Sequence, residues 1–139
     1  MELAALSNIY GSVLSRKAGV IFEFWNALSK GRPPVIYGKD VTRDFLHVDD
    51  AVKAVVLASL KPTNTRVNIS SSTEITLLSL YEMIRGHLGV ELEPIIKAAR
   101  NGEILRSCLD NTKAKNVLNW SPKINLETGI QLSIPKSSD

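Results

Sequence analysis

An arginine and an aromatic residue stand close together in a run whose residue types suit the binding of a phosphate group. Two-residue alternation across residues 43–48 places Arg43, Phe45 and His47 on one face of an extended segment. A guanidinium can donate two charge-assisted hydrogen bonds to one phosphate, and an adjacent ring suits a flat or sugar-like group. A solvated arginine on an edge strand explains the same pattern, so the residue types alone leave both interpretations open.

The neighbouring elements must hold this run in place. A short apolar segment at residues 34–37 turns at residues 38–40 into the run, and a helix over residues 49–60 follows directly. Asp49 or Asp50 is expected to cap the first amides of that helix. Its buried stripe is expected to consist of Val48, Ala51, Val52, Val55, Val56 and Ser59.

The rest of the chain alternates between short apolar segments and amphipathic segments with helical spacing. Strands are expected over residues 3–9, 66–70 and 93–97, and helices over residues 19–30, 77–88, 111–118 and 126–132. The strand at 3–9 is almost continuously hydrophobic, as in strands that are buried on both faces. Thr76 and Gly89 are expected to begin and end the helix over residues 77–88. This alternation predicts an α/β architecture with a disordered tail at residues 135–139.

Composition and charge exclude several classes of protein. The chain has 139 residues, 44% of them hydrophobic, and a formal net charge of +3. Its basic residues form no basic and aromatic stripe, so no nucleic-acid partner is expected. One cysteine, Cys108, and two histidines permit no internal disulfide and predict no metal site. Because the first residues resemble neither a signal peptide nor a membrane span, a cytoplasmic protein without a membrane partner is expected.

Four motifs occur in order and cover nearly the whole chain. They are Leu6-Ser7-Asn8-Ile9-Tyr10-Gly11; Val35-Ile36-Tyr37-Gly38 with Thr42-Arg43-Asp44-Phe45-Leu46-His47-Val48-Asp49-Asp50; Val67-Asn68-Ile69-Ser70; and Arg100-Asn101-Gly102-Glu103-Ile104 with Asp110, Ala114, Leu118, Trp120 and Pro122. Together they resemble the C-terminal half of an extended short-chain dehydrogenase/reductase. The most similar group is the NAD-dependent nucleotide-sugar epimerases and dehydratases, of which UDP-glucose 4-epimerase is the best known.

The resemblance implies a binding site for a nucleotide-sugar, either a UDP-sugar or a dTDP-sugar. Asn8 would sit beside the pyrophosphate of the substrate, and Ser7 would lie near the nicotinamide of NAD. The segment around Phe22, where the family usually has proline, would line the nucleotide pocket. Phe45 would lie alongside the nucleotide.

The charged residues of this site are also implied by the resemblance. Arg43 would hold the pyrophosphate, and Arg100 would make a second phosphate contact. Glu103, where the family usually has aspartate, would accept hydrogen bonds from the ribose hydroxyls, and a carboxylate suits a vicinal diol. The family usually has a glycine-rich turn where this chain has Ser70, Ser71 and Ser72, so the resemblance leaves the geometry of this turn open.

The resemblance also shows what this sequence does not contain. The dinucleotide-binding part of the family carries a glycine-rich fingerprint after its first strand, and this chain has no such motif. It also lacks the catalytic Tyr-x-x-x-Lys pair, because Leu14, Val41 and Arg85 stand four residues after its tyrosines. No catalytic residue is therefore assigned, and NAD, the cofactor of the parent family, is not expected to bind to this chain alone.

The expected fold is the last strands of a partial Rossmann-like sheet together with the small α/β substrate-binding domain, over residues 1–139. An incomplete sheet exposes an apolar edge and face, so a homo-oligomer or a complementing chain is expected. The expected function is the substrate-binding portion of a nucleotide-sugar epimerase or dehydratase that is non-catalytic by itself. A non-enzymatic α/β interaction module or a decayed fragment is the alternative.

Overall fold

The computed structural model describes residues 2–12, 17–61 and 64–136 of the chain. Helices and short strands alternate along these residues, which confirms the α/β prediction. The strands are β1 (Glu2–Leu6), β2 (Asn8–Tyr10), β3 (Val35–Tyr37), β4 (Thr42–Arg43), β5 (Phe45–His47), β6 (Arg66–Ile69), β7 (Ile75–Thr76) and β8 (Ile95–Lys97). The helices are α1 (Val20–Ser29), α2 (Val48–Ser59), α3 (Leu77–Leu88), α4 (Thr112–Leu118) and α5 (Leu126–Ser133).

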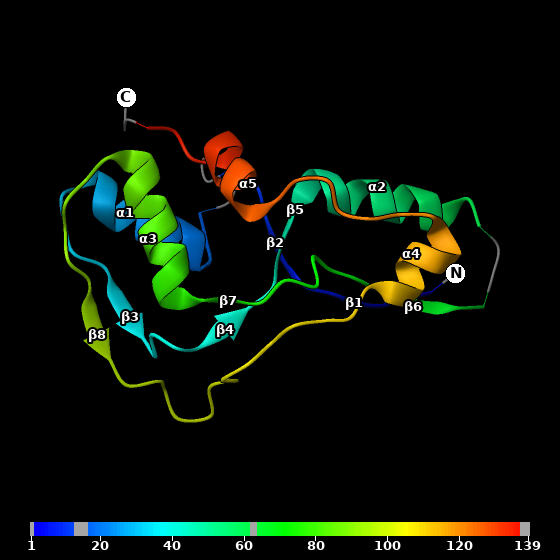
Figure 1. Ribbon diagram of the computed structural model, residues 1–139, viewed down its shortest axis with the longest axis horizontal. Helices are drawn as coiled ribbons and strands as arrows, with labels where there is room; N and C mark the ends of the chain where they lie inside the picture. Colours follow the sequence, from blue (N-terminus) through cyan, green and yellow to red (C-terminus); the bar gives the residue numbers. More distant parts are fainter. Residues whose placement is uncertain (1, 13–16, 62–63, 137–139) are drawn as a thin grey trace.

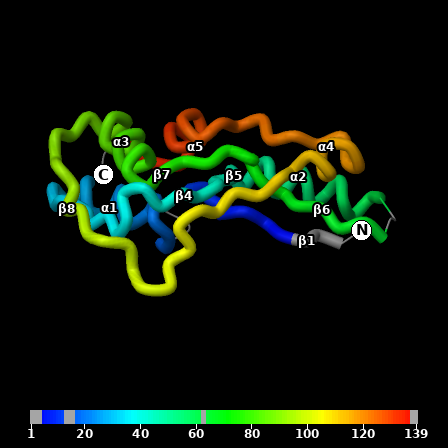
Figure 2. Tube along the Cα trace, turned by 60° about the horizontal axis from the view of Figure 1, so that its bottom comes forward, coloured from blue at the N-terminus to red at the C-terminus, as the bar shows by residue number. Residues whose placement is uncertain are grey.

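The molecule is elongated, with different elements at its two ends (Figures 1 and 2). Helices α1 and α3 lie at one end with β3 and β8, whereas α2 and α4 lie at the other end with β1 and β6. The yellow connection from β8 to α4 runs between the two ends along one side of the molecule (Figure 1). The segment that carries Arg100 and Glu103 belongs to this connection.

The predicted strand over residues 3–9 is two strands. β1 pairs in parallel with β6, whereas β2 pairs in parallel with β5. The chain changes partner at Ser7, because the Ser7 amide donates to the Ile69 carbonyl at 3.1 Å and the Asn8 amide donates to the Asp44 carbonyl at 3.0 Å. Burial on both faces is also wrong for Leu6, which is 48% exposed.

The predicted run over residues 43–48 is divided as well. β4 pairs antiparallel with β7, β5 pairs in parallel with β2, and Asp44 stands between them. The Asp44 side chain is buried and accepts hydrogen bonds from the backbone amides of Ser71 and Ser72, at 3.0 and 3.2 Å. These contacts fix the point at which the strand changes partner.

Two hydrophobic clusters form the core. The aromatic cluster contains Tyr10, Ile21, Phe24, Trp25, Leu28, Ile36, Phe45, Leu80, Tyr81, Ile84, Ile130 and Ile134. The alanine cluster contains Leu46, Ala51, Ala54, Ala58, Val67, Ile69, Ala114, Leu118 and Trp120. The β2–β5 pair separates them, since Phe45 belongs to the first cluster and Leu46 to the second. Successive side chains of β5 therefore point to opposite faces of the strand, as predicted, but both faces are buried.

Helix α2 buries a different face from the predicted stripe. Ala51 is buried as predicted, together with Ala54 and Ala58, whereas the valines of the stripe are exposed, Val52 to 55%. Small alanine side chains let the helix approach its neighbours closely. Asp50 is buried on the same side of α2. Its carboxylate accepts hydrogen bonds from the backbone amides of residues 123 and 124, both at 2.8 Å, and these contacts help to orient the helix.

The helix ends show one wrong and one correct prediction. His47 caps α2 instead of Asp49 or Asp50, since its Nδ1 accepts a hydrogen bond from the Asp49 amide at 3.2 Å. Thr76 begins α3 and Gly89 ends it with a φ of 66°, as predicted. A positive φ costs glycine little, because it has no Cβ.

The remaining expectations concern the tail, membranes and metals. Residues 137–139 of the predicted disordered tail lie outside the described residues. None of the described helices is long and apolar enough to span a membrane. The described residues also contain no group of at least three His, Cys, Asp or Glu side chains that could hold a metal ion.

Candidate ligand-binding pocket

A pocket of about 320 Å³ lies between β2, the first turn of α1, β4–β5 and the connection from β8 to α4. The predicted site residues Asn8, Phe22, Arg43, Phe45 and Glu103 all line it. These residues come from widely separated parts of the sequence, and the fold brings them around one cavity. Arg100 does not line this pocket.

The wall on the β2 side carries Asn8 and Tyr10. Tyr10 was not predicted as a site residue. Its hydroxyl is buried and has no hydrogen-bond partner among the described residues, and its ring packs edge-on against Phe45 and His47. Burial raises the pKa of Tyr10, and the negative charge of Asp50 acts in the same direction. Tyr10 is therefore neutral across the physiological pH range.

The first turn of α1 forms one side of the pocket. Gly19 is the N-cap, and no side chain caps the first amides of this helix in the described part of the chain. Residues 18–22 line the pocket. Unpaired amides at the positive end of a helix favour an anion. The sequence did carry a signal for this feature, because Gly19 supplies no side-chain oxygen at the start of a predicted helix.

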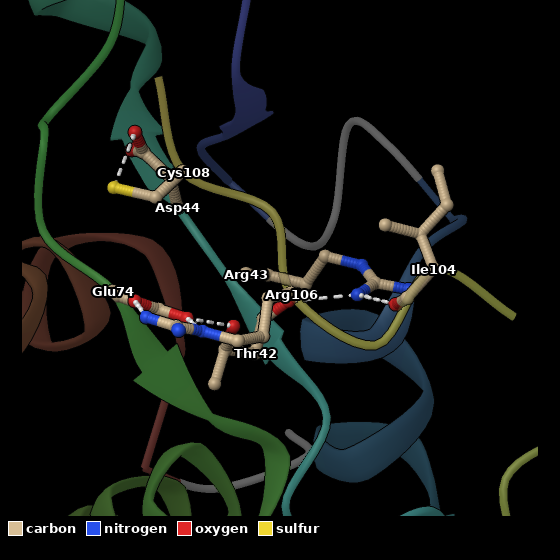
Figure 3. A network of polar contacts seen from close by, with 7 residues as sticks. All are labelled: Thr42, Arg43, Asp44, Glu74, Ile104, Arg106 and Cys108. Atoms are coloured by element: carbon tan, nitrogen blue, oxygen red, sulfur yellow. Dashed lines mark hydrogen bonds and ion pairs between the residues drawn. The ribbon is translucent and has the colours of Figure 1, made fainter. Parts of the chain in front are cut away.

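Arg43 and Glu103 form an ion pair across the pocket wall. The same guanidinium donates to the Thr42 and Ile104 carbonyls, at 2.7 and 2.6 Å, and Figure 3 shows it reaching Ile104. The two side chains are 19% and 26% exposed. Arg43 is therefore held in position by the β8–α4 connection and still reaches the cavity.

A second ion pair fixes this connection to the neighbouring strands. The Arg106 guanidinium donates to both carboxylate oxygens of Glu74, at 2.8 Å each (Figure 3). The hydrogen bond from Arg106, followed by that from Thr42, lowers the pKa of Glu74 to about 2. The Thr42 amide also donates to the Leu105 carbonyl at 2.9 Å. These contacts hold residues 103–106 beside the strand that carries Arg43.

Asp44 connects this region to the serine-rich turn. Its carboxylate accepts from the amides of Ser71, Ser72 and Leu109, and from the Ser71 hydroxyl at 2.6 Å. Ser72 has a φ of 55°, a conformation that favours glycine. The Ser72 hydroxyl donates to the Leu109 carbonyl at 2.8 Å and accepts from the Asn111 amide at 2.9 Å. Side-chain hydrogen bonds thus support this turn, whose geometry the sequence left open, with Ser72 in a conformation that favours glycine.

Arg100 lies away from the other predicted residues. It is exposed, and its guanidinium stacks over the Tyr37 ring at 4.2 Å. Both residues line a separate depression beside the end of α1. The structure therefore does not bring Arg100 to the pocket wall that contains Arg43.

Ser7 is the residue implied for contact with NAD. Its hydroxyl is buried and has no hydrogen-bond partner among the described residues. One hydroxyl is too little to hold a dinucleotide, whose pyrophosphate requires a glycine-rich turn at a helix N-terminus. Among the described residues, the Ser7 hydroxyl by itself does not fit NAD, so no chemical step is assigned to the cofactor.

Comparison with protein families gives one match across almost the entire chain. The model of the GDP-mannose 4,6 dehydratase family matches residues 3–133. The UDP-glucose 4-epimerase of Mycolicibacterium smegmatis is 37% identical over 134 residues, which cover 94% of this chain and 43% of that protein. The dTDP-L-rhamnose 4-epimerase of Burkholderia thailandensis is 28% identical, over 94% of this chain and 38% of that protein.

Comparison with solved structures also finds nucleotide-sugar epimerases. The UDP-glucose 4-epimerase of Thermotoga maritima, determined with UDP-glucose, has a TM-score of 0.86 and 34% identity. The match covers 94% of this chain and 44% of that one. The Thermus thermophilus UDP-glucose 4-epimerase in complex with NAD shares the fold, with a TM-score of 0.80 at 24% identity. The chain spans about two fifths of the length of the relatives that it matches.

Proposed function

Because the chain belongs to the GDP-mannose 4,6 dehydratase family and is related to NAD-dependent nucleotide-sugar epimerases, we propose that it is the substrate-binding portion of such an enzyme. Its ligand is a UDP- or dTDP-sugar. The observation that carries the proposal is the convergence of Asn8, Phe22, Arg43, Phe45 and Glu103 on one pocket. The UDP-glucose in the structure of the Thermotoga maritima relative supports the same ligand class.

Residues on different walls of the pocket contact different parts of the proposed ligand. Arg43 and the first turn of α1 stabilise the diphosphate, because both line one cavity and both bring positive charge to it. Asn8 adds an amide group beside them. Glu103 accepts hydrogen bonds from the ribose hydroxyls. The rings of Phe22 and Phe45 supply apolar surface for the nucleoside.

The chain alone is proposed to bind without catalysing a reaction. An acid-base tyrosine of the Tyr-x-x-x-Lys type is not present in the sequence, and among the described residues the Ser7 hydroxyl by itself does not fit NAD. The dinucleotide-binding part would come from a complementing chain, and a homo-oligomer is the other assembly proposed. Conversion of UDP-glucose to UDP-galactose by the purified chain would overturn the non-catalytic assignment.

Isothermal titration calorimetry with UDP and UDP-glucose tests the binding proposal. Removing a charged hydrogen-bond partner costs about 1.5–3 kcal/mol, roughly a 10- to 100-fold loss of affinity. Arg43→Ala should cause a loss of this size. Arg32→Ala is the matched control, because Arg32 is exposed and lines the separate depression instead. Equal affinities for wild type and Arg43→Ala, or no binding by the wild type, would contradict the proposal and favour the non-enzymatic module.

Arg100→Ala tests whether Arg100, like Arg43, contacts the phosphate groups of the ligand. A direct phosphate contact by Arg100 would require the guanidinium to leave the Tyr37 ring, where it lies at 4.2 Å. Arg100→Ala should therefore lower UDP affinity by less than Arg43→Ala. An equal loss would assign both arginines to the diphosphate.

A further inference from the structure

We propose that the outer edge of β8 pairs with the same edge of a second copy of this chain, so that the two copies form a symmetric dimer. Strand β8 pairs in parallel with β3, and no other strand of the described residues pairs with it. Figure 1 shows β8 at the outer edge of the molecule, far from α2 and α4. The inference goes beyond ligand binding and assigns a surface to the homo-oligomer.

The backbone of β8 offers hydrogen-bonding groups along this edge. The Ile95 amide donates to the Pro34 carbonyl at 2.9 Å. The Lys97 carbonyl accepts from the Gly38 amide at 2.8 Å. Both groups therefore face β3. Since successive backbone groups of a strand point to alternate sides, the amide and carbonyl of Ile96 point outward. An exposed edge of this kind is a template for a further strand.

The side chains at this edge are apolar and exposed. Ile95 and Ile96 are 46% and 45% exposed, and neighbouring side chains lie on opposite faces of a strand. A depression of about 470 Å³ beside the strand is lined by Ile96, Val41 and Leu105, among others. An added strand covers apolar surface on both faces. Because β8 has only three residues, the contact area is small and the dimer is expected to be weak.

Charges at the two ends of β8 select a second copy that runs antiparallel. Glu91 and Glu93 precede the strand and share one partner within the chain, Arg85, at 3.9 and 3.1 Å. One guanidinium does not neutralise two carboxylates, so this end stays negative. Lys97 and Arg100 make the other end positive. An antiparallel copy brings each negative end against a positive end, whereas a parallel copy would oppose like charges.

One antiparallel register uses both the charges and the backbone groups. With the symmetry axis at Ile95, Lys97 of each copy faces Glu93 of the other. Both stand an even number of residues from Ile95, so their backbone groups face β3. Cross-strand side chains are closest in pairs of this type, without mutual hydrogen bonds. The outward amide of Ile96 then faces the carbonyl of Pro94 in the second copy, and Pro94 has no amide to leave unpaired.

Sedimentation velocity over a range of protein concentrations tests the contact by exchanging its charges. Glu93→Lys and Lys97→Glu, each alone, oppose like charges at both symmetry-related positions. Each should raise the dimer dissociation constant by about tenfold, because two attractive cross-strand pairs become repulsive. The double variant Glu93→Lys with Lys97→Glu should restore association to the wild-type level. A general loss of stability would not produce this rescue.

Lys115→Glu is the matched control. It makes the same charge change at an exposed position of α4, at the other end of the molecule (Figure 1), and should leave association unchanged. Ile95→Lys provides a second test that alters neither charged pair. It places like charges on the symmetry axis and should abolish the dimer. Far-UV circular dichroism checks that each variant retains the fold.

The inference and the proposed function fail in different ways. A wild type that is monomeric at every concentration, or a double variant that associates no better than the single variants, would overturn the inference. Dissociation by Val52→Lys with Val56→Lys, but not by the β8 variants, would also overturn it and assign self-association to α2. UDP affinity should be unaffected by all β8 variants, because β8 does not line the pocket. A wild type that dimerises through β8 without binding UDP would refute only the proposed function.

Discussion

The aromatic cluster and the alanine cluster lie on opposite faces of the β2–β5 pair and are packed in different ways. The first is built from large side chains of α1, α3 and α5, such as Phe24 and Tyr81. The second is built around the alanines of α2 and α4, and α2 leaves Val52 and Val56 more than half exposed. The pocket lies against the first cluster, since Tyr10 and Phe45 belong to both. The comparison indicates that the shape of the pocket depends on the aromatic cluster, whereas the alanine cluster lies beneath a helix whose valines are exposed.

The largest effect is expected from truncation in the aromatic cluster. Phe24 is 2% exposed and meets Tyr81 edge-on, so Phe24→Ala removes buried area and leaves a cavity. Such changes cost about 3–5 kcal/mol. Urea unfolding followed by tryptophan fluorescence measures the loss. A loss of about 0.5 kcal/mol or less, as for ordinary surface substitutions, would show that the aromatic cluster is not tightly packed around Phe24.

The alanine cluster can be tested by the opposite change. Ala54 is fully buried where α2 meets its neighbours, so Ala54→Leu forces the helix outward. Overpacking of this kind costs roughly 1–3 kcal/mol. Val56→Leu, on the exposed face of the same helix, is the control and should leave the unfolding free energy nearly unchanged. Equal effects of the two variants would remove the distinction between the two faces of α2.

The pH dependence of the unfolding free energy tests the aromatic cluster, because that cluster contains Tyr10. Because burial raises the pKa of Tyr10 in the folded state, the folded chain keeps this proton at pH values where the unfolded chain loses it. The contribution of Tyr10 to stability is therefore complete below a pH of about 10, the ordinary tyrosine value, and is lost as the pH rises further. Tyr10→Phe should give a shallower fall of the unfolding free energy above this pH. Identical slopes for wild type and variant would exclude Tyr10 as a cause.

The smallest effect on folding is expected on the valine face of α2. The double variant Val52→Lys with Val56→Lys changes only exposed positions, so the unfolding free energy should change by about 0.5 kcal/mol or less. If this face supports the proposed self-association, sedimentation velocity should show a smaller species. A stability loss without a change in assembly would mean that these valines contribute to the core of the single chain.

Local signals predicted several features correctly. Thr76 and Gly89 mark the ends of α3 because capping depends on residue types close in sequence. The apolar stripe of α1 was likewise readable from its spacing, and α1 buries Ile21, Phe24, Trp25 and Leu28. The α/β class follows from the same kind of pattern.

Features that depend on distant contacts could not be predicted. The break at Asp44 requires hydrogen-bond donors from residues 71, 72 and 109, which no local pattern connects. Helix α2 carries apolar residues on more than one face, so spacing alone cannot decide between alanines and valines. For the pocket, the family resemblance named residues that do meet, but it could not foresee that Arg100 stacks on Tyr37 instead.

The adjacent residues Phe45 and Leu46 join the two clusters at a single peptide bond. Since one side chain belongs to the core on one side of β5 and the next belongs to the core on the other side, no loop exists at this boundary where the molecule could be cut. The two halves of this structure are therefore not interchangeable modules. A chimera that replaces one half must also supply a strand that satisfies both cores at once.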